Sequence, residues 1–376
     1  MKAKLFALLA VLPLVMPCVL RAQFITTTND GAITIVGYSG PGGALDIPTT
    51  INGLPVTGIG ADAFYYSANV TSLTIPDSVT NIGKSAFELC ISLASVKISS
   101  NITSIQDGLF EDCVDLGSVT VPAGVTNIGD GAFDDCSVLT NVIIPASVIS
   151  IGNSAFYGCA SLPGVVIPSN VAYLGIAAFQ SCSSLKSAVM PASVTAVGDD
   201  AFEGCLRLNH VVISPGVTSL GYSMFYNCTN LVTVTIPAGV TNIGPDAFAD
   251  CTRLTSLYFK GSAPSVDSTA FLNDTNLTIY YLPGSTGWSS ALGSRSAVLW
   301  NPLIQTSGSG FGIRTTQFGF TIAGTPNIPI VVEACANLAN PVWVPLQTLQ
   351  LTNGSFYFSE SWQTNGYGRY YRIRSP

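Results

Sequence analysis

The chain has 376 residues, of which 48% are apolar and only 9% are charged. A chain of this length can form more than one domain and bury a sizeable core. The net charge is −7, and 14 basic residues leave no basic patch for phosphates, so nucleic acid is not an expected partner. Abundant glycine and proline favour short strands and turns over long helices.

Residues 1–22 have the pattern of an export signal. Two lysines precede the apolar stretch 5–20, and a small residue, Ala22, lies at a plausible cleavage point. Two prolines interrupt the apolar stretch, which makes a membrane anchor the weaker alternative. No later stretch is long and apolar enough to span a bilayer. The sequence therefore predicts a mature chain that is secreted or held at the cell surface.

After an entry segment at 23–60, one residue type recurs at a fixed spacing. Such internal repetition is the signature of a repeat architecture. Ten phenylalanines are each 23 residues apart, without an insertion or deletion: Phe64, Phe87, Phe110, Phe133, Phe156, Phe179, Phe202, Phe225, Phe248 and Phe271.

Each 23-residue unit has the same internal pattern. Alanine precedes eight of the ten phenylalanines, and cysteine follows three residues after eight of them. A Val-x-Ile-Pro segment and a Val-x-x-Ile-Gly segment predict two short strands with a turn after each. One such unit cannot bury its apolar faces alone, but stacked units share a continuous core. We therefore expect a solenoid in which each phenylalanine lies on the next in an interior column.

The pattern Cys-x-x-Leu-x-x-Val-x-Ile-Pro-x-x-Val-x-x-Ile-Gly-x-x-Ala-Phe resembles the BspA-like (Treponema pallidum-type) leucine-rich repeats of bacterial surface proteins. The resemblance covers about residues 50–275, and it includes an entry segment at 53–60 and an exit at 259–264, 280–283 and 287–288. It implies a mainly β fold, with a leucine-rich-repeat solenoid of ten coils and a C-terminal cap over 61–302. It also implies an exported adhesin or binding protein.

Residues 303–376 lack the repeat. Alternating apolar and polar stretches at 318–322, 330–334, 347–351, 355–358 and 369–373 predict a small antiparallel β-sandwich. Within the segment 342–344, Trp343 is the expected core aromatic. Anchoring, export and capping all remain open as roles for this module.

The cysteines form a second column. Three interpretations are open for it: buried reduced thiols that pack one corner, some disulfides between adjacent coils, or a metal or catalytic role. Parallel side chains in one register rarely meet with disulfide torsions, which favours the thiols. Ser67 and Asp274 replace cysteine in the first and last coils, where we expect the corner to meet water. The column itself consists of Cys90, Cys113, Cys136, Cys159, Cys182, Cys205, Cys228 and Cys251.

No catalytic motif or cofactor fingerprint is present in the sequence. His210 is the single histidine, and it occupies a variable position before a strand, where we expect it to be exposed. The sequence therefore predicts neither a catalytic residue nor a metal or cofactor site.

Eight of the 21 acidic residues gather in the second to fourth coils, mostly beside the phenylalanine corner. A solvated edge is the first interpretation, a weak site for a divalent cation or a cationic partner the second, and a catalytic carboxylate pair the third. A catalytic pair would need a cleft rather than an exposed ridge. The residues are Glu88, Asp107, Glu111, Asp112, Asp115, Asp130, Asp134 and Asp135.

The outward position of the first strand gives the candidate ligand-binding face. Four consecutive coils carry β-branched apolar residues there, with polar residues on either side. Exposed apolar patches often mark interaction sites, but β-propensity alone favours the same residue types. The candidate residues are Lys97, Thr120, Ile143, Val166, Val189, Val212, Thr235 and Tyr258, preceded by Thr74.

These observations support three functional hypotheses. The first is a binding or adhesion protein outside the cell that engages a protein or glycan ligand through this face. The second is a structural envelope or spacer protein without a specific ligand. The third is a polysaccharide-acting enzyme that uses the acidic residues.

Overall fold

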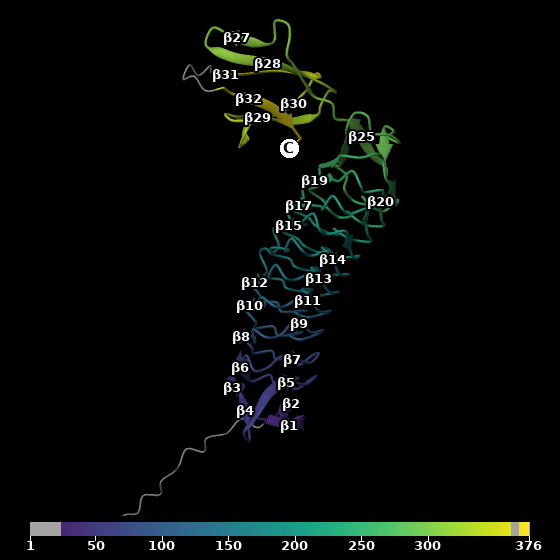
Figure 1. The fold of residues 1–376 in the computed structure, drawn as a ribbon. Helices are drawn as coiled ribbons and strands as arrows, with labels where there is room; N and C mark the ends of the chain where they lie inside the picture. Colours follow the sequence, from purple (N-terminus) through teal and green to yellow (C-terminus); the bar gives the residue numbers. More distant parts are fainter. Residues whose placement is uncertain (1–23, 362–367, 376) are drawn as a thin grey trace, which may run out of the picture.

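The computed structural model describes residues 24–361 and 368–375, so the predicted signal segment lies outside the described residues. Every regular element in the described part of the chain is a β-strand. Figure 1 shows these strands stacked into an elongated solenoid with a separate β module at its C-terminal end. The predicted fold class is confirmed.

The solenoid begins with a cap that continues its core. β1 (Phe24–Asn29) and β2 (Ala32–Tyr38) form an antiparallel hairpin, and β2 pairs in parallel with β5 (Leu54–Ile59). The two short strands β3 (Gly43–Asp46) and β4 (Thr50–Ile51) complete this end. The centroid of the Phe64 ring lies 6.4 Å from the centroid of the Phe24 ring and 5.3 Å from that of the Tyr38 ring. The cap therefore covers the first phenylalanine with aromatic surface.

In all but one coil, the first strand belongs to a single column along the solenoid. Residues 23 apart pair in parallel register, as Thr120 does with Ile143 and Val189 with Val212. Side chains alternate along each strand, so Val119 is buried while its neighbour Thr120 is exposed. The strands are β6 (Val70–Thr74), β8 (Ser95–Lys97), β10 (Ser118–Thr120), β12 (Asn141–Ile143), β15 (Ser187–Val189), β17 (His210–Val212), β19 (Thr233–Ile236), β21 (Ser256–Phe259), β23 (Thr278–Tyr281) and β25 (Arg295–Leu299).

This column is interrupted at the coil that carries Val166, which has no first strand. Pro163 precedes the residues 164–166 that correspond to the first strand of other coils, and it has no backbone N–H. In neighbouring coils that position donates to the preceding coil, as Thr140 N does to Gly117 O at 2.9 Å. Pro163 removes this bond, although its own carbonyl still accepts from Lys186 N.

A second column contains two-residue strands, seven of which are followed by a glycine. At Gly175 the preceding coil approaches closely, because a Cβ there would lie 2.3 Å from the Gly152 carbonyl carbon. The strands are β7 (Asn81–Ile82), β9 (Ser104–Ile105), β11 (Asn127–Ile128), β13 (Ser150–Ile151), β14 (Tyr173–Leu174), β16 (Ala196–Val197), β18 (Ser219–Leu220), β20 (Asn242–Ile243) and β22 (Ser265–Val266).

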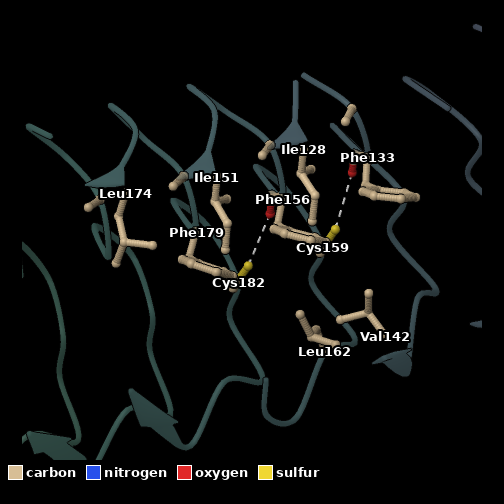
Figure 2. Close-up of a cluster of buried hydrophobic side chains, with 14 of the residues drawn as sticks. Ile128, Phe133, Val142, Ile151, Phe156, Cys159, Leu162, Leu174, Phe179 and Cys182 are labelled. Carbon is tan, nitrogen blue, oxygen red and sulfur yellow. Dashed lines mark hydrogen bonds between the residues drawn. The ribbon is translucent and has the colours of Figure 1, made fainter. Parts of the chain in front are cut away.

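The phenylalanine column is confirmed. Successive rings from Phe64 to Phe271 stack with centroids 5.1–6.1 Å apart and interplanar angles of 4–29°. Figure 2 shows Phe133, Phe156 and Phe179 in this column. All ten side chains are fully buried. The stacked rings explain why one residue type recurs without a change of spacing.

The C-terminal module is a sandwich of two antiparallel sheets, as predicted. β28 (Gln317–Ala323) pairs with β26 (Leu303–Gln305), β27 (Gly312–Arg314) and β31 (Ser355–Ser361). The second sheet has β29 (Pro329–Cys335) between β30 (Val344–Gln350) and β32 (Tyr370–Arg374). The short β24 (Ala291–Leu292) precedes β25. Phe320, Ile322, Ile330, Val332 and Phe358 form the module core.

The prediction that Trp343 is the core aromatic is wrong. Trp343 is half-buried, and its ring lies under the Arg372 guanidinium at 4.4 Å. It directly precedes β30, an edge strand, where flanking Val342 and Val344 are exposed. Phe320 and Phe358, whose ring centroids are 5.1 Å apart, fill the core instead.

Candidate binding face

The candidate face follows the outward column of the first strands. Lys97 pairs with Thr74, Thr120 with Ile143, and Val189 with Val212, so these residues form one row along the solenoid. Lys97 and Thr120 are exposed, and Thr235 is half-buried. The structure thus brings the predicted residues together on one side.

The apolar part of this row is open to solvent. The exposed fraction is 53% for Ile143, 82% for Val166, 47% for Val189 and 41% for Val212. The inward neighbours of these residues already fill the core, so the row has no packing role within the solenoid. A continuous row of exposed β-branched apolar side chains is a feature of interaction surfaces.

The second strand column has no comparable apolar row within the described residues. The residue before its strands is an exposed threonine in six coils. Some of these hydroxyls donate to the preceding coil, as Thr126 does to Thr103 O at 3.3 Å. The threonines are Thr80, Thr103, Thr126, Thr195, Thr218 and Thr241.

Tyr258 does not belong to the exposed face, contrary to the prediction. Its side chain is 6% exposed, and its ring stacks on Tyr280 at 5.0 Å. Both tyrosines pack into the cluster that includes Phe320 and Ile322 of the C-terminal module. The module therefore covers the end of the outward row, and periodicity within the repeat carries no signal for this contact.

The cysteine column is buried, and its thiols are unpaired with one another in the described chain. Each thiol donates a hydrogen bond to the phenylalanine carbonyl 26 residues earlier, as Cys159 does to Phe133 O at 3.2 Å and Cys182 to Phe156 O at 3.1 Å (Figure 2). Burial raises the pKa of the Cys90 and Cys182 thiols to about 12. A protonated thiol is neither a nucleophile nor a metal ligand, so the packing interpretation holds.

Asp274, at the end of this column, does not meet water as predicted. It is 1% exposed, and neither carboxylate oxygen has a hydrogen-bond partner. Burial raises the pKa of Asp274 to about 7. The nearby Arg295 charge lowers this pKa, and the Asp250 carboxylate raises it further. Ser67, at the other end of the column, is half-buried.

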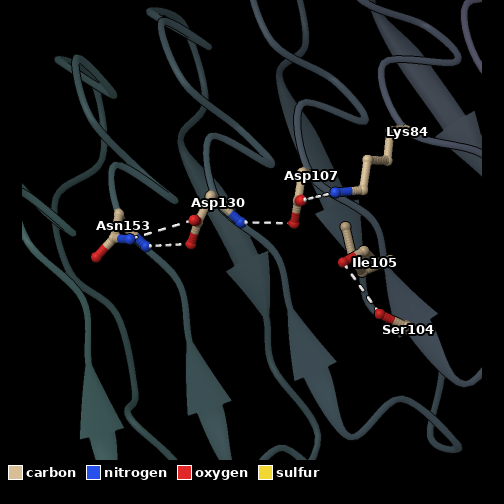
Figure 3. A network of polar contacts seen from close by, with 6 residues as sticks. All are labelled: Lys84, Ser104, Ile105, Asp107, Asp130 and Asn153. Atoms are coloured by element: carbon tan, nitrogen blue, oxygen red, sulfur yellow. Dashed lines mark hydrogen bonds and ion pairs between the residues drawn. The ribbon is translucent and has the colours of Figure 1, made fainter.

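The acidic residues divide into two groups with different surroundings. In the first, side chains cap the backbone of the next coil: Asp107 accepts from Asp130 N at 3.1 Å, and Asp130 accepts from Asn153 N at 2.7 Å. Lys84 pairs with Asp107 at the start of this ladder, which Figure 3 shows. The Lys84 hydrogen bond lowers the pKa of Asp107. These carboxylates stabilise turns.

The second group lies beside the phenylalanine corner, and the backbone explains part of it. The residue two positions after each phenylalanine is left-handed, with φ between 52° and 68°, a region in which Asp, Asn and Gly are enriched. The positions are Tyr66, Leu89, Asp112, Asp135, Gly158, Ser181, Gly204, Asn227, Asp250 and Asn273.

Burial and repulsion between neighbouring carboxylates raise the pKa of two acids near this corner, Asp134 and Glu111. Burial, then repulsion from Asp135 and Glu111, raises the pKa of Asp134 to about 7. Burial and Glu88 likewise raise the pKa of Glu111. Within the described residues, no group of three or more His, Cys, Asp or Glu side chains is placed to hold a metal ion. His210 is exposed, as predicted.

The geometry described above is that of a leucine-rich-repeat solenoid. The family model for the BspA type leucine rich repeat region matches residues 57–186 and 174–288, in six copies. The chain therefore belongs to this family. None of the curated proteins matches the chain.

The chain is similar to solved structures from several bacteria. A leucine-rich cell surface protein from Faecalibacterium prausnitzii A2-165 is 29% identical, over 70% of this chain and 93% of that chain, with a TM-score of 0.37. The leucine-rich repeat protein of T. pallidum is 28% identical, over 64% of this chain and 90% of that chain, with a TM-score of 0.34. A leucine-rich repeat protein from Bacteroides ovatus is 23% identical, over 74% of this chain and 98% of that chain, with a TM-score of 0.38.

In the described part of the chain, no helix has the length and hydropathy needed to cross a membrane.

Proposed function

We propose that this chain is an exported binding or adhesion protein, secreted or held at the cell surface, that engages a protein ligand through its first-strand face. The carrying observation is the exposed apolar row Ile143, Val166, Val189 and Val212. Family membership and the similarity to a bacterial cell surface protein support an extracellular binding role. A protein ligand is favoured over a glycan because the centre of the row offers aliphatic side chains rather than aromatic rings or charges.

The ligand makes contact by covering the apolar row, and burial of that row supplies the affinity. Burying apolar surface stabilises a complex by about 25 cal/mol per Å² before the cost of association is subtracted. The hydroxyl and amide side chains beside the row, such as Ser118 and Asn141, can form hydrogen bonds at its edge.

The test is a screen of the mature chain against arrays of matrix proteins and glycans, followed by two double variants. Val166→Asp with Val189→Asp places charges in the row and should abolish binding to the ligand found. Thr126→Asp with Thr195→Asp makes the same charge change on the second-strand face and should leave binding intact. Equal binding by both double variants would move the site elsewhere, and a glycan as the ligand would contradict the protein class.

A further inference from the structure

A cavity of about 350 Å³ lies between the last coils of the solenoid and the C-terminal module. Tyr258, Tyr280 and Trp300 line it with aromatic rings, and Ile373 closes it from the module side. Ligand sites in proteins are concave, mostly apolar and about 300–1,000 Å³, with a small number of polar groups that fix orientation. This cavity has that composition.

Tyr258 lines the cavity with its apolar atoms rather than with its hydroxyl. Its side chain is 6% exposed, whereas its hydroxyl oxygen is fully buried, so a ligand in the cavity does not reach that oxygen.

The polar group available to a ligand is the Lys260 ammonium at the exposed edge of the cavity. None of the ion pairs in the described residues involves Lys260. Arg374, which also lines the cavity, is already engaged: it donates to Glu333 Oε1 and to Ser375 O, each at 2.7 Å. Lys260 is therefore the cation that remains for a ligand.

We propose that this cavity binds an aromatic ring that carries a carboxylate, with the ring against the tyrosines and Trp300 and the carboxylate on Lys260. Aromatic rings pair with such walls by offset stacking or edge contacts, and a lysine accepts a carboxylate as a point charge. A sugar ring fits less well, because its several hydroxyls each need a partner and the cavity has few.

The cavity also adjoins the proposed binding face, because Thr235 belongs to both. The ring and carboxylate can therefore come from a segment of the protein ligand that lies along the face, or from a free aromatic acid. The first source rests on the proposed function, whereas the second does not.

Ligand-observed NMR on the full mature chain tests the proposal. The probes are phenylacetate, phenylacetamide, the blocked dipeptide acetyl-Phe-Asp-amide and glucuronate. We expect phenylacetate to bind about tenfold more tightly than phenylacetamide, since the amide lacks the charge. Preference for the dipeptide would indicate a protein segment as the source, and preference for phenylacetate a free acid. Binding of glucuronate alone, or of no probe, would overturn the proposal.

One variant and three controls assign the effect to the cavity. Lys260→Met should weaken phenylacetate binding about tenfold and remove the preference over the amide. Tyr258→Phe keeps the ring and removes only the buried hydroxyl, so it should leave phenylacetate binding unchanged. Lys186→Met, at an exposed lysine outside the cavity, should change nothing. Val166→Asp should also leave phenylacetate binding unchanged, so failure of the binding face and failure of this site are distinguishable. Equal binding by Lys260→Met and the unmodified chain would refute the site, and thermal midpoints confirm that each variant is folded.

Discussion

Cys251 and Asp274 occupy equivalent positions in successive coils, and both are buried, but only the Cys251 side chain has a hydrogen-bond partner. The Cys251 thiol donates to the Phe225 carbonyl at 3.1 Å, 26 residues earlier. The same offset from Asp274 leads to the Phe248 carbonyl. A protonated carboxyl at this position can donate as the thiol does, whereas a carboxylate cannot.

Asp274 should therefore make stability depend on pH. The pKa of Asp274 is about 7 in the folded chain, above its ordinary value of about 3.9. Protonation of Asp274 therefore contributes fully to the stability of the fold below about pH 3.9, and this contribution is lost as the pH rises through 7. We expect Asp274→Asn, which stays neutral, to lose less stability than the unmodified chain between pH 5 and pH 8. Thermal midpoints at the two pH values measure this. An identical pH dependence in both proteins would show that Asp274 is ionised throughout.

The phenylalanine column should dominate the stability of the solenoid. Phe156 is fully buried between Phe133 and Phe179, with ring centroids 5.3 Å from each. Phe156→Ala removes the ring and should reduce the free energy of unfolding by about 3–5 kcal/mol. Urea denaturation measures the change. Ile149→Ala, at a 55% exposed position, is the control and should change it by less than about 0.5 kcal/mol.

The repeat made most of the solenoid predictable. A strict 23-residue spacing determines which residues share a column, and parallel pairing then brings Val189 beside Val212 without further information. The same periodicity indicated that the phenylalanines and cysteines are buried. Where each residue has one neighbour above and one below, sequence order and spatial order coincide.

The errors fall where that order ends. Tyr258 has the repeat pattern of an exposed residue, yet a module more than 40 residues later in sequence covers it. Asp274 has the residue type of an exposed corner, yet the coils beyond it bury it. The acids at 112 and 135 suggested a site, whereas a left-handed backbone position favours them. Contacts between modules and backbone conformation do not follow from spacing.

Thiol reactivity distinguishes packed thiols from disulfides in the cysteine column. The nine cysteines of the described chain are buried and free. Burial also raises the pKa of the eight thiols in the column, and at Cys113 and Cys205 it lies well above the usual range. The mature folded chain should therefore react very slowly with a thiol reagent at pH 8, and all of its cysteines should react in guanidinium without reductant. Fewer thiols after unfolding would show that adjacent coils are joined by disulfides.

Two glycines of the solenoid, Gly175 and Gly164, should respond differently to one added methyl group. A Cβ at Gly175 would lie 2.3 Å from the Gly152 carbonyl carbon and 2.4 Å from Asn153 N, both backbone atoms that cannot move aside. At Gly164 nothing lies within 4 Å. We expect Gly175→Ala to destabilise the chain by about 1–3 kcal/mol, because the coils must separate locally. Gly164→Ala should be neutral or slightly stabilising, since it only restricts the unfolded chain. Urea midpoints compare the two, and equal midpoints would contradict the close approach of successive coils.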